Sequence, residues 1–384
     1  MQSICAIDEL NTWGVKEKKY GLALIKASGT CAAVFTTNKV RAPVINLMAE
    51  RIKKRGYLSG IIVNSGCANA YTGKRGYEDA ITMATIGADA MGIDENEVGV
   101  ASTGVIGRYL DLDRINRQSI EVSQKLCNSE QAEMAAANAI GTTDTFQKHA
   151  LIKRPDFTVA GICKGSGMIA PNMGTMLAFI YTDVDISSSD LQTSLKVATN
   201  RSFNRVVVDG DESTNDSVFC TATGSAGKIN QKEFETALEQ CCVSLAKQIA
   251  TDGEGATKLL EVRVKGTRSE SDAEMIARTI AKSPLVKTAV YGEDPNWGRI
   301  VCAAGYSGVD FDINELSLSI GEGPDETVLV KNGDITADLV KAKKNMIGKK
   351  VVVTVTLESG SEEAVAWGCD LTEKYVEING RYTT

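Results

Sequence analysis

A glycine and a threonine at positions 174 and 175 stand between a polar, glycine-rich loop and an apolar run, Met176 to Tyr181. A threonine hydroxyl is a weak nucleophile that needs a neighbouring base. If the bond before Thr175 is cut, the new α-amine supplies that base, because its ordinary pKa is roughly 7.7–8.0. Gly174 leaves its carbonyl open to attack. These residue types predict self-cleavage and an N-terminal nucleophile, although they also fit an ordinary loop before a core strand.

The elements that would position this threonine form a mixed α and β pattern. Short apolar runs typical of strands lie at 22–25, 32–35, 60–63, 179–181 and 351–356. Amphipathic patterns typical of helices lie at about 77–91, 130–140, 188–201, 231–250, 272–282 and 336–346. Asn230 with Glu233, and Ser271 with Glu274, have the spacing of capping boxes and predict two helix starts.

Composition excludes several classes of protein. The chain has 384 residues, enough for two lobes, and a net charge of −7 without a basic block that would indicate nucleic-acid binding. No apolar run approaches the roughly 18 residues of a membrane span. The first residues lack the pattern of a secretory signal, so we expect a cytoplasmic protein.

The cysteines and the histidine do not suggest a metal site. The ten cysteines are scattered without a Cys-x-x-Cys pair, and His149 is the only histidine. A structural zinc site therefore has no suitable ligand set, and the cysteines are expected to be reduced core residues. We expect His149 to be a bystander, and no metal to be bound.

Two short motifs resemble binding loops without meeting their requirements. Residues 165–170 fit G-x-G-x-x-A, but Pro171 and a predicted strand follow where a dinucleotide site needs a helix. Residues 209–215 resemble the start of a calcium loop, yet they lack its sixth-position glycine, and Cys220 stands where the loop needs glutamate. Neither motif predicts a cofactor.

The run from Lys164 to Leu177, KGSGMIAPNMGTML, resembles the self-cleavage segment of the ornithine acetyltransferase family, the glutamate N-acetyltransferases of arginine biosynthesis. Other segments match the same family in the same order and span almost the whole chain: NSGCANA at 64–70, STGVIG at 102–107, TTDT at 142–145, VDGDESTND at 208–216, DGEGATK at 252–258, GEDPNWGR at 292–299 and EINGRYTT at 377–384.

The resemblance implies a fold and a subunit organisation. It implies an α/β/β/α sandwich that resembles N-terminal nucleophile hydrolases but has its own connectivity. Cleavage between Gly174 and Thr175 would give an alpha fragment, 1–174, and a beta fragment, 175–384, that share one fold. Family members assemble from two alpha and two beta fragments.

The resemblance also assigns roles to single residues. Thr175 corresponds to the nucleophile, and Thr103 with Gly104 to the oxyanion hole. Lys164 and Glu254 are expected to pair with a substrate carboxylate and the ornithine amine, respectively. The remaining substrate-contacting positions are Thr143, Thr175, Asn379 and Thr384, with Thr142 as a competing assignment for Thr143.

The activity implied is acetyl transfer from N2-acetylornithine to glutamate by a ping-pong reaction through Thr175, without a metal or an organic cofactor. Three alternatives stay open. A bifunctional enzyme would also take acetyl from acetyl-CoA, and a related self-processing aminopeptidase or amidase would use water as the acceptor. The third alternative is an uncleaved, non-catalytic protein that binds a small molecule.

Overall fold

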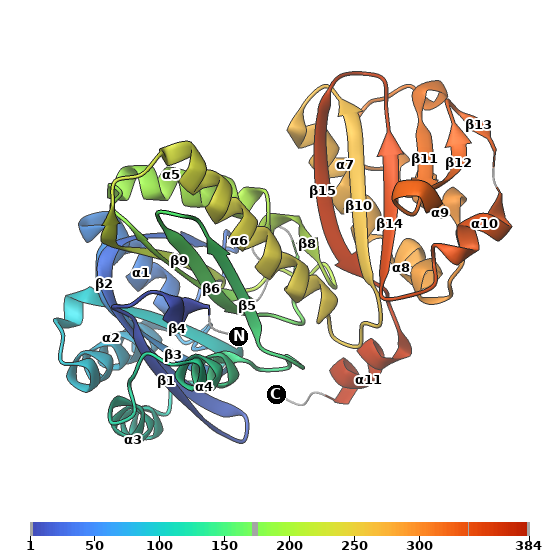
Figure 1. The fold of residues 1–384 in the computed structure, drawn as a ribbon. Helices are drawn as coiled ribbons and strands as arrows, with labels where there is room; N and C mark the ends of the chain where they lie inside the picture. Colours follow the sequence, from blue (N-terminus) through green and yellow to red (C-terminus); the bar gives the residue numbers. More distant parts are fainter. Residues whose placement is uncertain (1–2, 171–175, 337, 382–384) are drawn as a thin grey trace.

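The computed structural model describes residues 3–170, 176–336 and 338–381. Gly174, Thr175 and Thr384 lie outside the described residues, so the predictions that concern them are not tested by the coordinates. The described chain forms two sheets with helices around them, in two lobes (Figure 1). The predicted mixed α/β fold is confirmed.

The first lobe is built on a sheet with strand order β4-β3-β2-β9-β7-β6-β5, in which β1 pairs with β2. The strands are β1 (Asn11–Glu17), β2 (Tyr20–Phe35), β3 (Tyr57–Cys67), β4 (Val98–Val105), β5 (Lys148–Lys153), β6 (Thr158–Lys164), β7 (Leu177–Val184) and β9 (Ser217–Gly227). The predicted strands at 22–25 and 32–35 are both parts of β2. That strand pairs with β3 along its first half and with β9 along its second, with a register shift between Lys26 and Gly29.

The two halves of this sheet share a core. Phe179 and Tyr181 of β7 lie in one apolar cluster with Leu22 and Ile25 of β2, whereas the intervening Ile180 lies in a second cluster. Because alternate residues of a strand face opposite sides, β7 has one face toward the β2 half and the other toward helices. The first lobe therefore has the predicted α/β/β/α layers.

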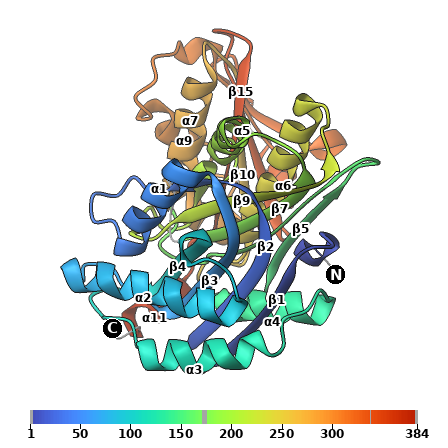
Figure 2. The ribbon, with the colours of Figure 1, turned by 90° about the vertical axis from the view of Figure 1, so that its left-hand side faces the viewer.

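Helices cover both outer faces of the first lobe. Figure 2 shows α1 (Pro43–Arg55), α2 (Gly73–Met91) and α3 (Leu112–Ser123) on one side and α5 (Ser188–Asn200) with α6 (Gln231–Thr251) on the other. The helix α4 (Glu130–Ile140) packs against β1 and β2. Among the described helices, none is long and apolar enough to cross a membrane.

The second lobe is built on a sheet with order β13-β12-β11-β14-β10-β15-β8. Its strands are β8 (Val206–Val207), β10 (Leu259–Thr267), β11 (Ser317–Ile320), β12 (Thr327–Lys331), β13 (Asp334–Ile335), β14 (Lys350–Thr356) and β15 (Glu362–Cys369). Its helices are α7 (Glu270–Lys282), α8 (Pro284–Tyr291), α9 (Trp297–Gly305) and α10 (Leu339–Lys344). A last helix, α11 (Glu373–Arg381), leads back toward the first lobe (Figure 1).

One of the two predicted helix starts is confirmed. The Asn230 side chain accepts hydrogen bonds from the backbone N–H groups of Lys232 and Glu233, as a helix cap should. The prediction for Ser271 is wrong, because α7 already begins at Glu270 and the cap is Ser269. The Ser269 backbone is extended, and its hydroxyl accepts from the Asp272 N–H.

The predicted division at 174/175 falls inside the first lobe. The strands β6 and β7 on either side of it pair antiparallel, and Lys164 stands opposite Leu177 in the ladder. The strand β7 also pairs with β9, with Leu177 opposite Ser217. Residues before and after the predicted cut therefore belong to one sheet. The second sheet, apart from the two-residue strand β8, is built from β10 onward.

Candidate active site

Strand ends from both halves of the first sheet meet at the candidate site. The ladder places the end of β6, at Lys164, beside the start of β7, at Leu177, and the start of β9, at Ser217. Parallel strands β3 and β4 pair Gly66 with Gly104 and then end together, one residue later, at Cys67 and Val105. Motifs that are far apart in the sequence therefore come together at strand ends.

Thr103 and Gly104 lie at the end of β4 and have the features expected of an oxyanion site. Thr103 is 1% exposed, and its Oγ1 has no hydrogen-bond partner among the described residues. Gly104 has φ of +130°, and a Cβ there would lie 2.3 Å from the Gly66 carbonyl carbon. Only glycine fits this backbone. A buried hydroxyl without a partner costs free energy unless a ligand uses it.

Asn215 ties the loop before β9 to the ends of β3 and β4. Its Nδ2 donates to the carbonyl oxygens of Ala68, at 2.7 Å, and of Ser102, at 2.9 Å. The segment 208–216 resembles the family, but no role was predicted for Asn215 within it. The sequence alone does not predict these two hydrogen bonds, because both acceptors are backbone carbonyl oxygens of distant segments.

Lys164 is a buried cation without an ion partner in the part of the chain that the structure describes. It is 2% exposed and forms no hydrogen bond or ion pair with the residues that the structure describes. Burial lowers the pKa of this ammonium, and Asp144 partly opposes that change. Asp144 itself is bonded to Lys148 at 2.7 Å and accepts the Gly165 N–H at 2.7 Å. Lys164 is therefore left available for an anionic group.

A network of paired charges lies close to Lys164, because Asp144 and Lys148 both act electrostatically on it. Lys148 is fully buried and binds Asp144 at 2.7 Å and Asp252 at 2.5 Å. Burial tends to raise the pKa of Asp144, but Lys164 and Lys148 hold it well below its usual range. No role was predicted for these residues from the sequence. Only Asp144 lies in a segment that resembles the family, TTDT, and that resemblance is the one feature of the sequence that points to this network.

Glu254 and Asn379 lie together at the other end of the pocket. Asn379 of α11 donates from Nδ2 to Glu254 Oε2 at 2.8 Å. The backbone N–H of Glu254 donates to the Ser166 carbonyl at 3.0 Å, and the Ser166 hydroxyl donates to the Asp252 carbonyl at 2.6 Å. These bonds fix the loop after β6 against the turn after α6.

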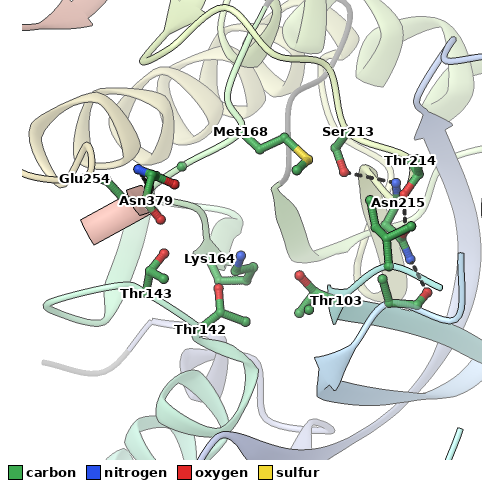
Figure 3. Close-up of a pocket in the computed structure, with 14 residues that line it drawn as sticks. Thr103, Thr142, Thr143, Lys164, Met168, Ser213, Thr214, Asn215, Glu254 and Asn379 are labelled. Carbon is green, nitrogen blue, oxygen red and sulfur yellow. Dashed lines mark hydrogen bonds between the residues drawn. The ribbon is translucent and has the colours of Figure 1, made fainter. Parts of the chain in front are cut away.

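The pocket brings together most of the predicted site residues. Figure 3 shows Thr103 and Asn215 on one side, Glu254 and Asn379 on the other, and Lys164 between them. Thr142 and Thr143 both line it, so the choice between them stays open. Its volume of about 150 Å³ is similar to that of cavities that bind benzene-sized molecules. The remaining lining residues in the described chain are Ala68, Gly104, Ile106, Gly167, Met168, Ser213 and Thr214.

Other chemistry has little support in the described residues. No group of three or more His, Cys, Asp or Glu side chains that could hold a metal is found in the described ranges. His149 contacts Glu133 Oε1 at 2.7 Å and Ser3 Oγ at 3.2 Å, rather than the pocket. Its position agrees with the bystander assignment.

The layered α/β fold and a pocket in which a buried cation and a buried hydroxyl lack partners among the described residues are the features of an enzyme that binds a small anionic molecule. The chain belongs to the ArgJ family, which matches residues 9–384.

Among curated relatives, glutamate N-acetyltransferase of Methanosarcina mazei is 47% identical, covering 99% of this chain and 98% of that protein. The arginine biosynthesis bifunctional protein ArgJ of Archaeoglobus fulgidus is 46% identical, covering 97% of each. A crystal structure of ArgJ from Bacillus halodurans aligns with a TM-score of 0.51 and 44% identity, covering 53% of this chain and 98% of that chain.

Proposed function

We propose that this chain is a glutamate N-acetyltransferase that moves an acetyl group from N2-acetylornithine to glutamate in arginine biosynthesis. The observation that carries the proposal is the buried Lys164, which has no ion partner within the described ranges, in a pocket that has Glu254 at its other end. A cation at one end and a carboxylate at the other complement an amino acid, which carries both charges. The names of the relatives support the same activity.

The active enzyme would form by cleavage between Gly174 and Thr175. The fragment 175–384 would hold 384 − 174 = 210 residues, or about 55% of the chain. The Bacillus halodurans chain aligns to 53% of this chain, although curated relatives cover 97% or more. That length is what a separate beta fragment would give. Pairing of β6 with β7 would hold the two fragments together after the cut.

The proposed reaction has two stages. Thr175 first attacks the Gly174 carbonyl, an ester replaces the peptide bond, and water releases the two fragments. Mature Thr175 then takes the acetyl group from N2-acetylornithine, ornithine leaves, and glutamate enters the same pocket to collect the acetyl group. This ping-pong order needs no metal or organic cofactor.

The other residues would serve binding and charge stabilisation. The Thr103 hydroxyl and the backbone N–H of Gly104 would donate to the oxyanion. Lys164 would bind a substrate carboxylate, and Glu254, held by Asn379, the ornithine amine. Thr143 or Thr142, which both line the pocket, would also contact the substrate. The terminal carboxylate of Thr384 would have to dock at the site, so a short C-terminal tag should harm activity.

A bifunctional enzyme that also uses acetyl-CoA is a second candidate. Relatives of nearly equal similarity carry the monofunctional and the bifunctional name. Formation of acetylglutamate from acetyl-CoA and glutamate, without acetylornithine, would establish the second activity. Release of free acetate instead of transfer would favour an amidase. We further infer a cytoplasmic assembly of two alpha and two beta fragments.

Intact mass under denaturing conditions tests the proposal most directly. Two species with the masses of 1–174 and 175–384 are expected, together with acetyl transfer between the two amino acids. A single chain of 41.0 kDa with no transfer activity would contradict the proposal and favour a binding protein.

A further inference from the structure

Two buried lysines, Lys148 and Lys164, lie near the same carboxylate, and only one of them is paired with it. Lys148 is fully buried, and its Nζ lies 2.7 Å from Asp144 Oδ1. Lys164 is 2% exposed and forms no ion pair with Asp144 or with another residue in the described ranges. Burial lowers the pKa of Lys164, and Asp144 is the carboxylate that most opposes this change. Asp144 therefore attracts both cations but contacts one.

The strand ladder explains how one carboxylate can reach two lysines. Lys148 begins β5 and stands opposite Cys163 of β6, the residue before Lys164. Because neighbouring residues of a strand face opposite sides, the two lysines leave the sheet on opposite faces. Asp144 lies beyond the end of these strands, where one of its oxygens accepts the Gly165 N–H at 2.7 Å. The carboxylate is thus at the sheet end that both side chains share.

A second carboxylate completes the pairing of Lys148. Asp252 Oδ2 lies 2.5 Å from the Lys148 Nζ, and the Asp252 side chain is also buried. Asp252 accepts the backbone N–H of Thr145 at 3.0 Å as well, which fixes its position. Burial alone would lower the pKa of Lys148, but the carboxylates, Asp144 foremost, raise it above its ordinary value. Lys148 is therefore the cation that this cluster keeps in an ion pair.

We propose that Lys148 is a positioning residue for substrate binding: by holding Asp144 in an ion pair, it leaves the Lys164 ammonium free for a substrate carboxylate. The inference rests on the proposed function, in which Lys164 binds that carboxylate. Without Lys148, Asp144 would be a buried charge that has lost its contacting cation, which is strongly unfavourable. Lys164 is the neighbouring cation that would replace it, and this new ion pair would compete with the substrate.

The first test is a steady-state assay of acetyl transfer by Lys148→Met, which removes the charge but keeps a long side chain. KM for the amino-acid substrates should rise by about tenfold or more, with a smaller change in kcat, because Lys164 turns toward Asp144. An unchanged KM would overturn the proposal.

Lys258→Met is the matched control for Lys148→Met. Lys258 is also buried and lies 2.7 Å from a carboxylate oxygen of Glu293, but it does not line the pocket. Its KM should stay within about twofold of wild type, since the site and this pair share no partner. A rise in KM equal to that of Lys148→Met would show that loss of any buried lysine has this effect, and would overturn the proposal.

A second substitution separates competition for Lys164 from a loss of packing. Asp144→Asn has nearly the same size but lacks the charge that would attract Lys164. Added to the Asp144→Asn variant, Lys148→Met should therefore raise KM by only about threefold or less. If Lys148 merely supported the fold, its loss would cost as much in both backgrounds. That outcome would overturn the proposal, and the double variant decides the question even where Lys148→Met alone does not fold.

A crystal structure of the folded Lys148→Met enzyme gives a readout that does not depend on catalysis. Lys164 Nζ is expected within about 4 Å of an Asp144 oxygen, the distance of an ion pair. A Lys164 side chain that stays unpaired would overturn the proposal. Failure of the proposed function is a different result: wild-type enzyme would then transfer no acetyl group. Wild-type transfer together with an unchanged KM in Lys148→Met would remove only the role of Lys148.

Discussion

Each lobe of this chain contains a cluster of buried charge, and the two clusters differ in how their charges are balanced. In the second lobe, Glu261 is surrounded by partners. Its oxygens accept from Trp367 at 3.0 Å and from Arg263 at 2.9 Å, and they pair with Lys247 at 3.1 Å and Lys350 at 3.6 Å. Both oxygens of this carboxylate therefore have partners within the chain.

In the first lobe, Lys148 is paired in the same complete way with Asp144 and Asp252, but Lys164 beside them has no such partner in the described chain. Thr103 adds a buried hydroxyl oxygen without a hydrogen-bond partner among the described residues. Unpaired buried groups are destabilising, so a fold keeps them only where another interaction compensates. We therefore expect the first cluster to serve substrate binding and chemistry, and the second to serve stability.

Replacing Thr175 with alanine tests the first part of this comparison and has the largest expected effect. Thr175→Ala should leave one uncut chain and no measurable acetyl transfer, because it removes the only proposed nucleophile. Intact mass and an assay of acetylglutamate formation check both results. Two fragments from this variant would contradict the assignment of Thr175.

Removing the unpaired cation should cost less than removing the nucleophile. Lys164→Met keeps the length of the side chain but loses its charge, so the substrate carboxylate is left without its partner. We expect kcat/KM to fall by on the order of 100-fold, or about 3 kcal/mol, while some self-cleavage continues.

Lys247→Met is the matched control for Lys164→Met. Lys247 also contacts a buried cluster, with its ammonium 5.4 Å from the centre of the Trp367 ring and in an ion pair with Glu261. Its kcat/KM should stay within about twofold of wild type. Equal losses in the two lysine variants would show that the comparison between the clusters is wrong.

The sequence predicted the layered fold better than the details of the site. Local periodicity located the helix at 130–140 and the cap at Asn230, because these depend on neighbouring residues. Resemblance placed Thr103, Lys164, Glu254 and Asn379 together, and they do line one pocket.

What the sequence could not predict depends on contacts between distant segments. Asn215 acts on carbonyls that lie 113 and 147 residues away, and Lys148 joins carboxylates on two different elements. The continuity of β2 through both halves of the sheet was also missed, since its apolar run is interrupted by Lys26 and Gly29. Pairing partners, rather than local composition, decide these features.

Neutralising Glu261 should affect stability but not catalysis. Arg263, Lys247 and Trp367 outweigh burial and lower the pKa of Glu261 from 4.5 to about 2. Because the unfolded chain binds this proton at higher pH than the folded chain, the stabilisation is present above about pH 4.5. It is lost as pH falls through about 2. A shift of this size corresponds to at most roughly 3 kcal/mol.

The measurement is the free energy of unfolding in urea between pH 7 and 3, followed by tryptophan fluorescence. Glu261→Gln should be less stable at pH 7 and should depend less steeply on pH than wild type. The control is Glu322→Gln, since Glu322 pairs with Arg263 and Lys350 but is half exposed and should matter less. Loss of acetyl transfer by folded Glu261→Gln protein would contradict the division of roles between the clusters.

The smallest expected effect concerns Asn379, the residue of α11 that connects the end of the chain to the pocket. Asn379→Ala removes the 2.8 Å bond to Glu254 Oε2, which leaves the carboxylate free to turn away from the substrate amine. Asn379 is exposed, so a loss of about 0.5–1.5 kcal/mol is expected, or roughly a 2- to 12-fold rise in KM. Because Asn379 positions a binding group rather than the nucleophile, kcat should change less than KM. An equal fall in kcat and kcat/KM with KM unchanged would instead show that Asn379 stabilises the transition state. Residues that take part in the chemistry would then include one from α11 as well as those of the first lobe.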